Sequence, residues 1–192
     1  MKPIVLASSS IYRKELLQKL NLKFITDAPN IDESPLNNEQ PKHLAMRLAK
    51  EKAEAIQSKY NNHIIIASDQ VASFNHHILG KPGSHSQSIQ QLKLQSGQTV
   101  DFFTSICVID SSSNESHSDI DICTVHFKEL SEQQILNYLN FDKPYDCAGS
   151  FKSEGLGIAL FDKIESEDPN TLIGLPLIKL IKLLNLFKIE II

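Results

Sequence analysis

The segment Ile64-Ile65-Ile66-Ala67-Ser68-Asp69-Gln70 places an acidic residue directly after an apolar run. Three consecutive isoleucines are typical of a short strand that is buried in a sheet. We therefore expect the strand to be interrupted at Asp69, with the carboxylate held at the rim of the sheet, where α/β proteins usually bind ligands. A buried aspartate must be hydrogen-bonded, ion-paired or metal-bound. Asp69 is accordingly the first candidate for a functional residue.

On both sides of this segment, predicted strands alternate with predicted helices. Strands are expected at residues 3–7, 23–26, 63–74, 99–109, 117–128, 158–164 and 187–192. Helices are expected at residues 11–20, 41–60, 84–95, 131–140 and 175–186. The pattern indicates a mixed α/β fold with antiparallel strands in its second half. Because no repeat or linker divides the chain, we expect one domain over residues 1–192.

Composition narrows the class of function. Of the 192 residues, 41% are hydrophobic and 22% are charged, which is ordinary for a globular protein. The net charge of −4 argues against a nucleic-acid polymer as partner. No apolar stretch approaches the roughly 18 residues of a membrane span, so no membrane partner is expected. The three cysteines form no CxxC pair, which favours reduced thiols and a cytoplasmic location over a disulfide framework or a zinc site.

The turn after the first predicted strand is a candidate phosphate site. Ser8, Ser9 and Ser10 precede the predicted helix 11–20, whose N-terminus carries partial positive charge. Arg13 adds a forked donor in the first helical turn. The chain contains no GxxxxGK[ST], so this is not a Walker A loop. The alternative is a simple helix cap beside a solvated arginine.

Several other charged residues are ordinary singly but suggestive together. Glu33 lies in an acidic, proline-flanked loop, Lys52 flanks the apolar stripe of the predicted helix 41–60, and Lys81 lies in a Gly-Lys-Pro turn. Lys152 and Glu154 are two residues apart in a glycine-flanked loop, so they face one ligand or pair with each other. An acid for metal or water and several cations would suit a polyphosphate substrate.

Seven short segments occur in an order that resembles a known family. They are Leu6–Arg13, Asp32–Ser34, Arg47–Ala53, Ser68–Gln70, Gly80–Pro82, Ala148–Gly155 and Gly174–Pro176. Together they resemble the Maf family of nucleoside triphosphate pyrophosphatases over essentially the whole chain. The resemblance implies an elongated, curved mixed sheet flanked by helices, like that of the inosine-triphosphate pyrophosphatases, and a homodimer. The implied reaction converts a nucleoside triphosphate to the monophosphate and pyrophosphate with a divalent metal cation, Mg²⁺, Mn²⁺ or Co²⁺.

The same resemblance assigns roles to the candidate residues. Asp69 matches the catalytic acid, which would orient and deprotonate the attacking water. Asp69 and Glu33 are the implied metal ligands, and which of them binds the metal is left open. The implied substrate-binding residues are Ser8, Arg13, Lys52 and Lys81. Their donors would neutralise charge on the phosphates.

Three positions separate two branches of the family. The branch that prefers dTTP and UTP carries arginine, threonine and glutamine there, whereas the branch that prefers 7-methyl-GTP carries an aromatic residue, glutamine and glutamate. The matching residues here are Tyr12, Gln70 and Glu154, which resemble the second branch. A tyrosine face would attract the cationic 7-methylguanine ring by roughly 0.5–2 kcal/mol. Glu154 would accept from the guanine N1–H and amine, and Gln70 would serve either base edge.

This chain departs from the second branch at three places and leaves two alternatives open. Tyr12 stands where tryptophan is usual, Ile11 where proline is usual, and Lys14 where arginine is common, so we expect looser selectivity. One alternative is a dTTP/UTP pyrophosphatase. The other is a nucleotide-binding regulator of cell division with little hydrolysis, which a damaged catalytic set would favour. None of the catalytic set is missing here.

Overall fold

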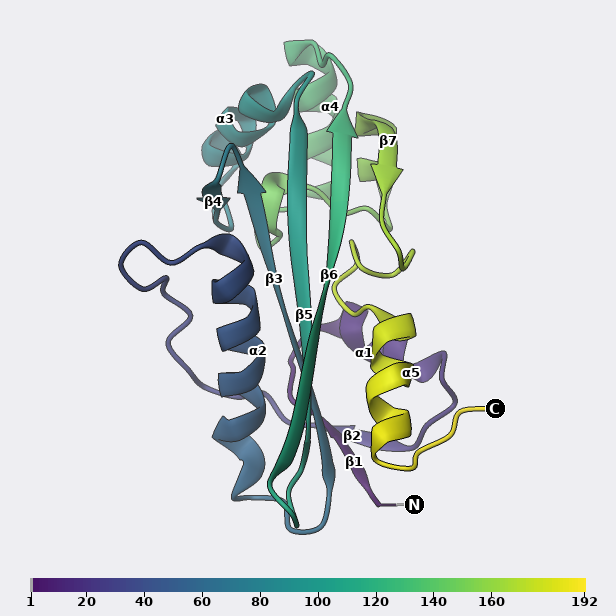
Figure 1. Ribbon diagram of the computed structural model, residues 1–192. Helices are drawn as coiled ribbons and strands as arrows, with labels where there is room; N and C mark the ends of the chain where they lie inside the picture. The colour runs from purple at the N-terminus through teal and green to yellow at the C-terminus, as the bar shows by residue number, and fades with distance from the viewer. Residues whose placement is uncertain (1) are drawn as a thin grey trace.

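One seven-stranded mixed sheet forms the frame of the molecule (Figure 1), which the computed structural model describes for residues 2–192. The strands are β1 (Ile4–Leu6), β2 (Phe24–Thr26), β3 (Ile64–Phe74), β4 (His77–Leu79), β5 (Thr99–Asp110), β6 (Glu115–Phe127) and β7 (Phe161–Glu165). Their order is β2-β1-β3-β5-β6-β7, with β4 also paired to β3. Only β1 makes parallel pairs, with β2 and β3. The mixed α/β class expected from the sequence is confirmed.

Helices cover both faces of the long strands. They are α1 (Ile11–Gln18), α2 (Pro41–Gln57), α3 (His85–Gln95), α4 (Glu132–Asp142) and α5 (Leu177–Leu186), with short 3₁₀ turns at Ala148–Ser150 and Leu156–Leu160. In Figure 1, α2 lies along one side of β3, β5 and β6, while α1 and α5 lie on the other. Ile64 and Ile66 of β3 pack with the α1 and α5 cluster, whereas Ile65 and Ala67 pack with α2. The alternation of side chains along β3 therefore produces two core layers.

An interruption in the sheet lies beside the polar part of β3. Along one edge of β3, β1 pairs with residues 64–66 and β4 with residues 72–74, while β5 covers the opposite edge over residues 64–73. Residues 67–71 thus have no strand partner on the first edge. The expected interruption of the strand at Asp69 is wrong, because β5 continues the ladder and pairs Ser105 with Asp69. The rim expected for Asp69 exists instead as this gap between β1 and β4.

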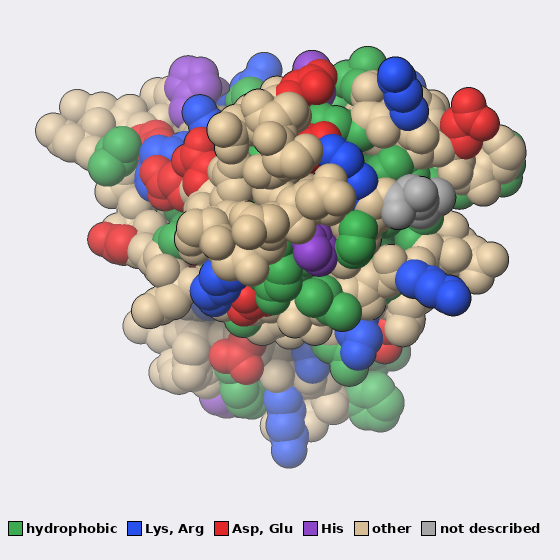
Figure 2. All heavy atoms as spheres, turned by 90° about the horizontal axis from the view of Figure 1, so that it is seen from below, with side chains coloured by type: hydrophobic (Ala, Val, Ile, Leu, Met, Phe, Trp, Pro, Cys, Tyr) green, Lys and Arg blue, Asp and Glu red, His purple; other side chains and the backbone are tan. Residues whose placement is uncertain are grey.

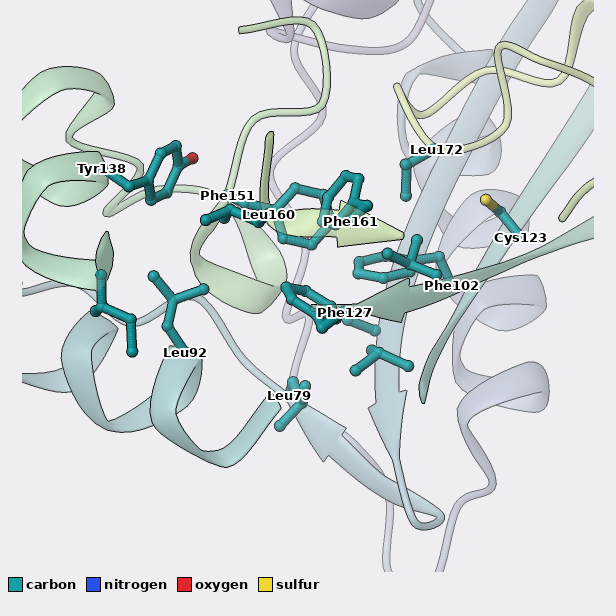
Figure 3. Packing of buried hydrophobic residues seen from close by; sticks show 14 of the residues in the cluster. Leu79, Leu92, Phe102, Cys123, Phe127, Tyr138, Phe151, Leu160, Phe161 and Leu172 are labelled. Atoms are coloured by element: carbon teal, nitrogen blue, oxygen red, sulfur yellow. The ribbon is translucent and has the colours of Figure 1, made fainter. Parts of the chain in front are cut away.

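An aromatic cluster joins α3 and α4 to the far end of the sheet. Phe102, Phe127, Phe151 and Phe161 pack edge to face, with ring centroids 4.8–5.7 Å apart (Figure 3). Leu92 of α3 and Tyr138 of α4 belong to the same buried cluster. Such pairs add directional packing to the burial of apolar area. Because Phe151 is fixed there, the segment that follows it leaves the core from a defined position.

The structure corrects two expected strands. The tail 187–192 is not a strand: Lys188 has φ +60°, and Ile189 N–H bonds back to the Leu184 carbonyl, which ends α5 in a turn. The first three residues of the expected strand 158–164 belong instead to a 3₁₀ turn. That turn brings Gly157 so close to the Lys152 carbonyl oxygen that an added Cβ would lie 2.3 Å from it. Only glycine fits such an approach.

The cysteines, the helices and the surface can also be compared with the expectations from composition. Cys107, Cys123 and Cys147 are free thiols, the first two buried. Among residues 2–192, no helix has both the length and the apolar character needed to cross a membrane. On the face shown in Figure 2, Lys and Arg side chains are interspersed with Asp and Glu side chains. That face offers no extended basic area of the kind that nucleic-acid polymers need.

Candidate active site

A cavity of about 850 Å³ lies at the gap between β1 and β4. Its walls come from the turn after β1, the loop before α2, one side of α2, the middle of β3, β4 and the loop after it, residues 146–148 and 151–154, and residues 172–174. All nine residues singled out from the sequence line it: Ser8, Tyr12, Arg13, Glu33, Lys52, Asp69, Gln70, Lys81 and Glu154. The fold thus brings together side chains that lie far apart in the sequence, from Ser8 to Glu154.

The serine turn is ordered by its own side chains. Ser8 Oγ accepts from Ser10 N–H at 3.1 Å, and Ser10 Oγ caps α1 by accepting from Arg13 N–H at 3.3 Å. Ser8 is buried at the cavity wall. In this arrangement both hydroxyls accept from backbone N–H groups, which leaves each hydroxyl hydrogen able to donate to a bound anion.

Arg13 is held by a backbone carbonyl, a contact that the sequence did not predict. Its Nε donates to Gly174 O at 2.9 Å, and Ser68 Oγ donates to the same oxygen at 2.9 Å. Gly174 has φ +114°, a conformation that favours glycine. The Nη1 and Nη2 groups of Arg13 donate to no protein acceptor within residues 2–192. The anchored guanidinium is therefore available to bind phosphate oxygens.

Lys52 lies between two carboxylates. Its Nζ is 2.5 Å from Asp69 Oδ1 and 2.6 Å from Glu33 Oε1. Lys52 and Asp69 are buried, whereas the Glu33 side chain is half-exposed. Burial raises the pKa of Asp69, and the charges of Lys52 and Arg13 only partly offset this. Burial opposes ionisation of Glu33 as well, but the hydrogen bond and charge of Lys52 outweigh it and lower the pKa of that carboxyl.

The two carboxylates also test whether a divalent metal fits. Among residues 2–192, no three His, Cys, Asp or Glu side chains are grouped to hold a metal ion. Within that part of the chain, Asp69 Oδ2 and Glu33 Oε2 accept no hydrogen bond, so one oxygen of each acid is available beside Lys52. Mg²⁺ typically binds through one or two carboxylates and completes its shell with water and phosphate oxygens. The donor set fits such a shared ion.

Lys81 is exposed in the loop after β4 and forms no ion pair with another described residue. Its charge contributes to lowering the pKa of Glu33, after the larger effects of burial and Lys52. Lys81 therefore adds positive potential to the acidic side of the cavity and keeps its ammonium group for a ligand.

Tyr12 and Glu154 occupy another part of the wall. Burial, and then the neighbouring Glu154 carboxylate, raise the pKa of the Tyr12 hydroxyl. Lys152 forms no ion pair with Glu154, and its Nζ instead donates to the Asp142 carbonyl at 3.0 Å. Glu154 is exposed, and its carboxylate accepts from Ser153 Oγ at 3.3 Å. Of the two readings of this loop, the internal salt bridge is wrong.

The side-chain amide of Gln70 makes several hydrogen bonds within the protein. Its Nε2 donates to Thr104 Oγ1 at 2.9 Å and to the carbonyls of Thr171 at 2.9 Å and Leu172 at 3.1 Å. The amide nitrogen is therefore occupied in holding the turn that leads to Gly174. Only Oε1 is left to meet a ligand, so the expectation that Gln70 serves either base edge narrows to an acceptor role.

A cavity that combines a buried aspartate, several cations and a tyrosine in its wall is the type of site that binds a nucleotide through its phosphates and base. The chain belongs to the Maf family, because the family model described as Maf-like protein matches residues 3–187.

Curated relatives and a solved structure extend this comparison. The 7-methyl-GTP pyrophosphatase of Pseudoalteromonas translucida is 52% identical over 98% of this chain and 94% of that protein. The protein of the same name from Colwellia psychrerythraea is 51% identical over 100% of this chain and 96% of that protein. A HAM1 protein from Coxiella burnetii overlaps with TM-score 0.49 and 19% identity, over 68% of this chain and 75% of that one.

Proposed function

We propose that this protein hydrolyses 7-methyl-GTP to 7-methyl-GMP and diphosphate, and so clears a modified nucleotide. The proposal depends above all on one observation: a single cavity holds Asp69 and the cations Arg13, Lys52 and Lys81 together with Tyr12 and Glu154. The first group suits the triphosphate and the second suits a cationic purine. Relatives named 7-methyl-GTP pyrophosphatase, at about half identity over nearly the full chain, support the same substrate.

Asp69 is the proposed base. A water oriented by its carboxylate attacks the α-phosphorus, the bond from that phosphorus to the bridging oxygen breaks, and the water proton passes to Asp69. Diphosphate is the leaving group. Burial raises the pKa of Asp69, so the carboxylate is a stronger base than an exposed aspartate. Arg13, Lys52 and Lys81 would neutralise the charge that develops on the phosphates.

Asp69 and Glu33 are the proposed ligands for a divalent cation. When bound, such an ion would neutralise phosphate charge and fix the orientation of the triphosphate. Lys52, between the two acids, holds both carboxylates at the same side of the cavity.

Base recognition is assigned to Tyr12 and Glu154. The methylated guanine ring carries positive charge, so it is attracted both to the aromatic face and to the carboxylate. Glu154 accepts from the N1–H and the exocyclic amine of guanine, whereas a pyrimidine would leave the carboxylate partly unpaired. Gln70 Oε1 is a further acceptor on the same cavity.

Pyrophosphate release is the direct test. Purified protein is assayed with Mg²⁺, Mn²⁺ or Co²⁺ against 7-methyl-GTP, GTP, dTTP, UTP and CTP. We expect the highest kcat/KM for 7-methyl-GTP. Preference for dTTP or UTP would retain the reaction and overturn the roles of Tyr12 and Glu154. Tight binding without any product would instead indicate a nucleotide-binding regulator.

The variant Glu154→Gln tests base recognition. We expect kcat/KM for 7-methyl-GTP to fall by roughly tenfold or more, and by much less for UTP, because the amide loses the charge and offers one acceptor fewer. Glu129→Gln is the matched control, since Glu129 is an exposed glutamate that does not line the cavity. Equal losses for both nucleotides would remove Glu154 from base selection.

The oligomeric state and the cellular location of the protein are proposed from its sequence. We propose a homodimer, on the basis of the family resemblance, and a cytoplasmic location, in keeping with three free thiols. Light scattering after size-exclusion chromatography measures the mass of the particle directly. A monomeric mass at assay concentration would contradict the homodimer.

A further inference from the structure

Gln91 of α3 does not line the cavity, but it contacts Gly80, which does, and Ser150, which lies between lining residues of the 146–154 segment. Its Nε2 donates to the Gly80 carbonyl at 2.9 Å, and its Oε1 accepts from Ser150 Oγ at 2.5 Å. The Gly80 carbonyl can only accept, which fixes which end of the amide faces it, and the Ser150 hydroxyl then donates to the other end. One rigid amide group therefore connects two loops that are 70 residues apart in sequence.

Each of these loops carries a proposed ligand-binding residue. Gly80 is bonded directly to Lys81, which is assigned to the phosphates. Ser150 ends the turn Ala148–Ser150 and precedes Phe151, after which the chain reaches Glu154. Ser150 is fully buried and has φ +64°, so its backbone is held in a conformation that few non-glycine residues adopt. A contact that fixes this turn also fixes where the Glu154 segment begins.

Neighbouring contacts strengthen the same connection. Gln95, one turn further along α3, donates to Gly149 O at 2.9 Å and to Gln91 O at 3.0 Å. From the other side, Gly83 N–H donates to Tyr145 O at 2.9 Å, and the Tyr145 hydroxyl lies 3.0 Å from His85 Nδ1. The loop after β4 and the segment 145–150 are thus joined at several points, and Gln91 is the member that joins them through a single side chain.

We propose that Gln91 is a positioning residue that sets the separation between Lys81 and Glu154, and hence between the phosphate and base subsites. The inference rests on the proposed function of the cavity. One nucleotide must reach both subsites in a conformation that presents its α-phosphorus to the water, so a change in their separation weakens binding and misplaces that atom. Gln91 acts through these loops and does not touch the substrate.

Three variants distinguish the contributions of the two hydrogen bonds made by the Gln91 amide. Gln91→Ala removes both contacts, Gln91→Glu retains an acceptor for Ser150 but places a carboxylate oxygen against the Gly80 carbonyl, and Ser150→Ala removes only the second contact. Gln90→Ala is the matched control, because Gln90 is an exposed glutamine on the same helix. Each variant is assayed for kcat and KM with 7-methyl-GTP and UTP, and its thermal unfolding is recorded.

Distinct patterns are expected. Gln91→Ala lowers kcat/KM for 7-methyl-GTP by roughly tenfold and reduces the preference over UTP. Gln91→Glu lowers kcat/KM for both nucleotides and retains the preference. Ser150→Ala mainly reduces the preference, and the double variant of Gln91→Ala with Ser150→Ala adds little to Gln91→Ala alone. A Gln91→Ala protein with the kinetics of Gln90→Ala would overturn the proposal, even if its unfolding temperature fell.

Hydrogen exchange tests whether Gln91 couples the two loops without relying on enzyme activity. In Gln91→Ala, the amides of residues 80, 81 and 83 and those of residues 149–154 should exchange together at least tenfold faster, whereas Gln90→Ala leaves them unchanged. That result would support the coupling even if the parent protein released no pyrophosphate, which would refute only the assigned reaction. Faster exchange in one loop alone, or in neither, would refute the coupling.

Discussion

Asp69→Asn is expected to lower kcat for pyrophosphate release by at least about 10²-fold while the protein stays folded. The carboxamide has nearly the same shape, but it is a far poorer base and metal ligand. Its Oδ1 still accepts from Lys52, which also keeps Glu33 at 2.6 Å, so the buried lysine is not left without partners. The loss should therefore appear in turnover and not in the cooperativity of unfolding.

Two measurements make this result specific to Asp69. Asp162→Asn, at an exposed position of β7, serves as control and should match the parent protein in kcat. The parent should lose activity on the acidic side as Asp69 becomes protonated, and because burial raises the pKa of Asp69 this loss should lie above the range of an exposed aspartate. Full turnover in Asp69→Asn would refute the assigned base.

Local sequence patterns predicted most of the elements of this fold. The run of isoleucines, the serine cap before α1 and the proline at the start of α2 each depend on interactions within a few residues. The continuation of β3 past Asp69 depends instead on its pairing with β5, whose register involves residues about 36 positions away. A polar residue in a strand looks like an interruption from sequence alone, whereas here it lies opposite Ser105 with its ladder intact.

The site likewise has features that the sequence predicted and features that it did not. Charged and aromatic residues in ordered motifs marked the nine positions that the cavity brings together. What the sequence did not reveal are contacts made to backbone carbonyls, such as those from Arg13 to Gly174 and from Gln91 to Gly80. A carbonyl oxygen is present at every residue, so its role has no sequence signature. The only available signal was glycine at residue 174, where φ is +114°.

Lys52→Met should both abolish most turnover and destabilise the protein. The variant leaves Asp69 buried without its nearest cation, and breaking a buried ion pair costs about 3–5 kcal/mol. We expect about 3 kcal/mol in the free energy of unfolding near neutral pH, at the lower end because Glu33 is half-exposed and the cavity admits water. Lys50→Met, at an exposed position of α2, is the control and should change stability by no more than about 0.5 kcal/mol.

The pH dependence of that loss distinguishes electrostatics from packing. Without the Lys52 charge, the pKa of Asp69 rises further above its ordinary value, and the pKa of Glu33 rises as well. A carboxyl whose pKa is higher in the folded than in the unfolded chain stabilises the fold below the unfolded pKa and loses that contribution as the pH rises through the folded pKa. The deficit of Lys52→Met relative to the parent, measured by urea unfolding, should therefore be smallest in acid and grow toward neutral pH. A deficit that is the same at every pH would mean that Lys52 supports the core through its methylene chain and does not hold Asp69 in its charged form.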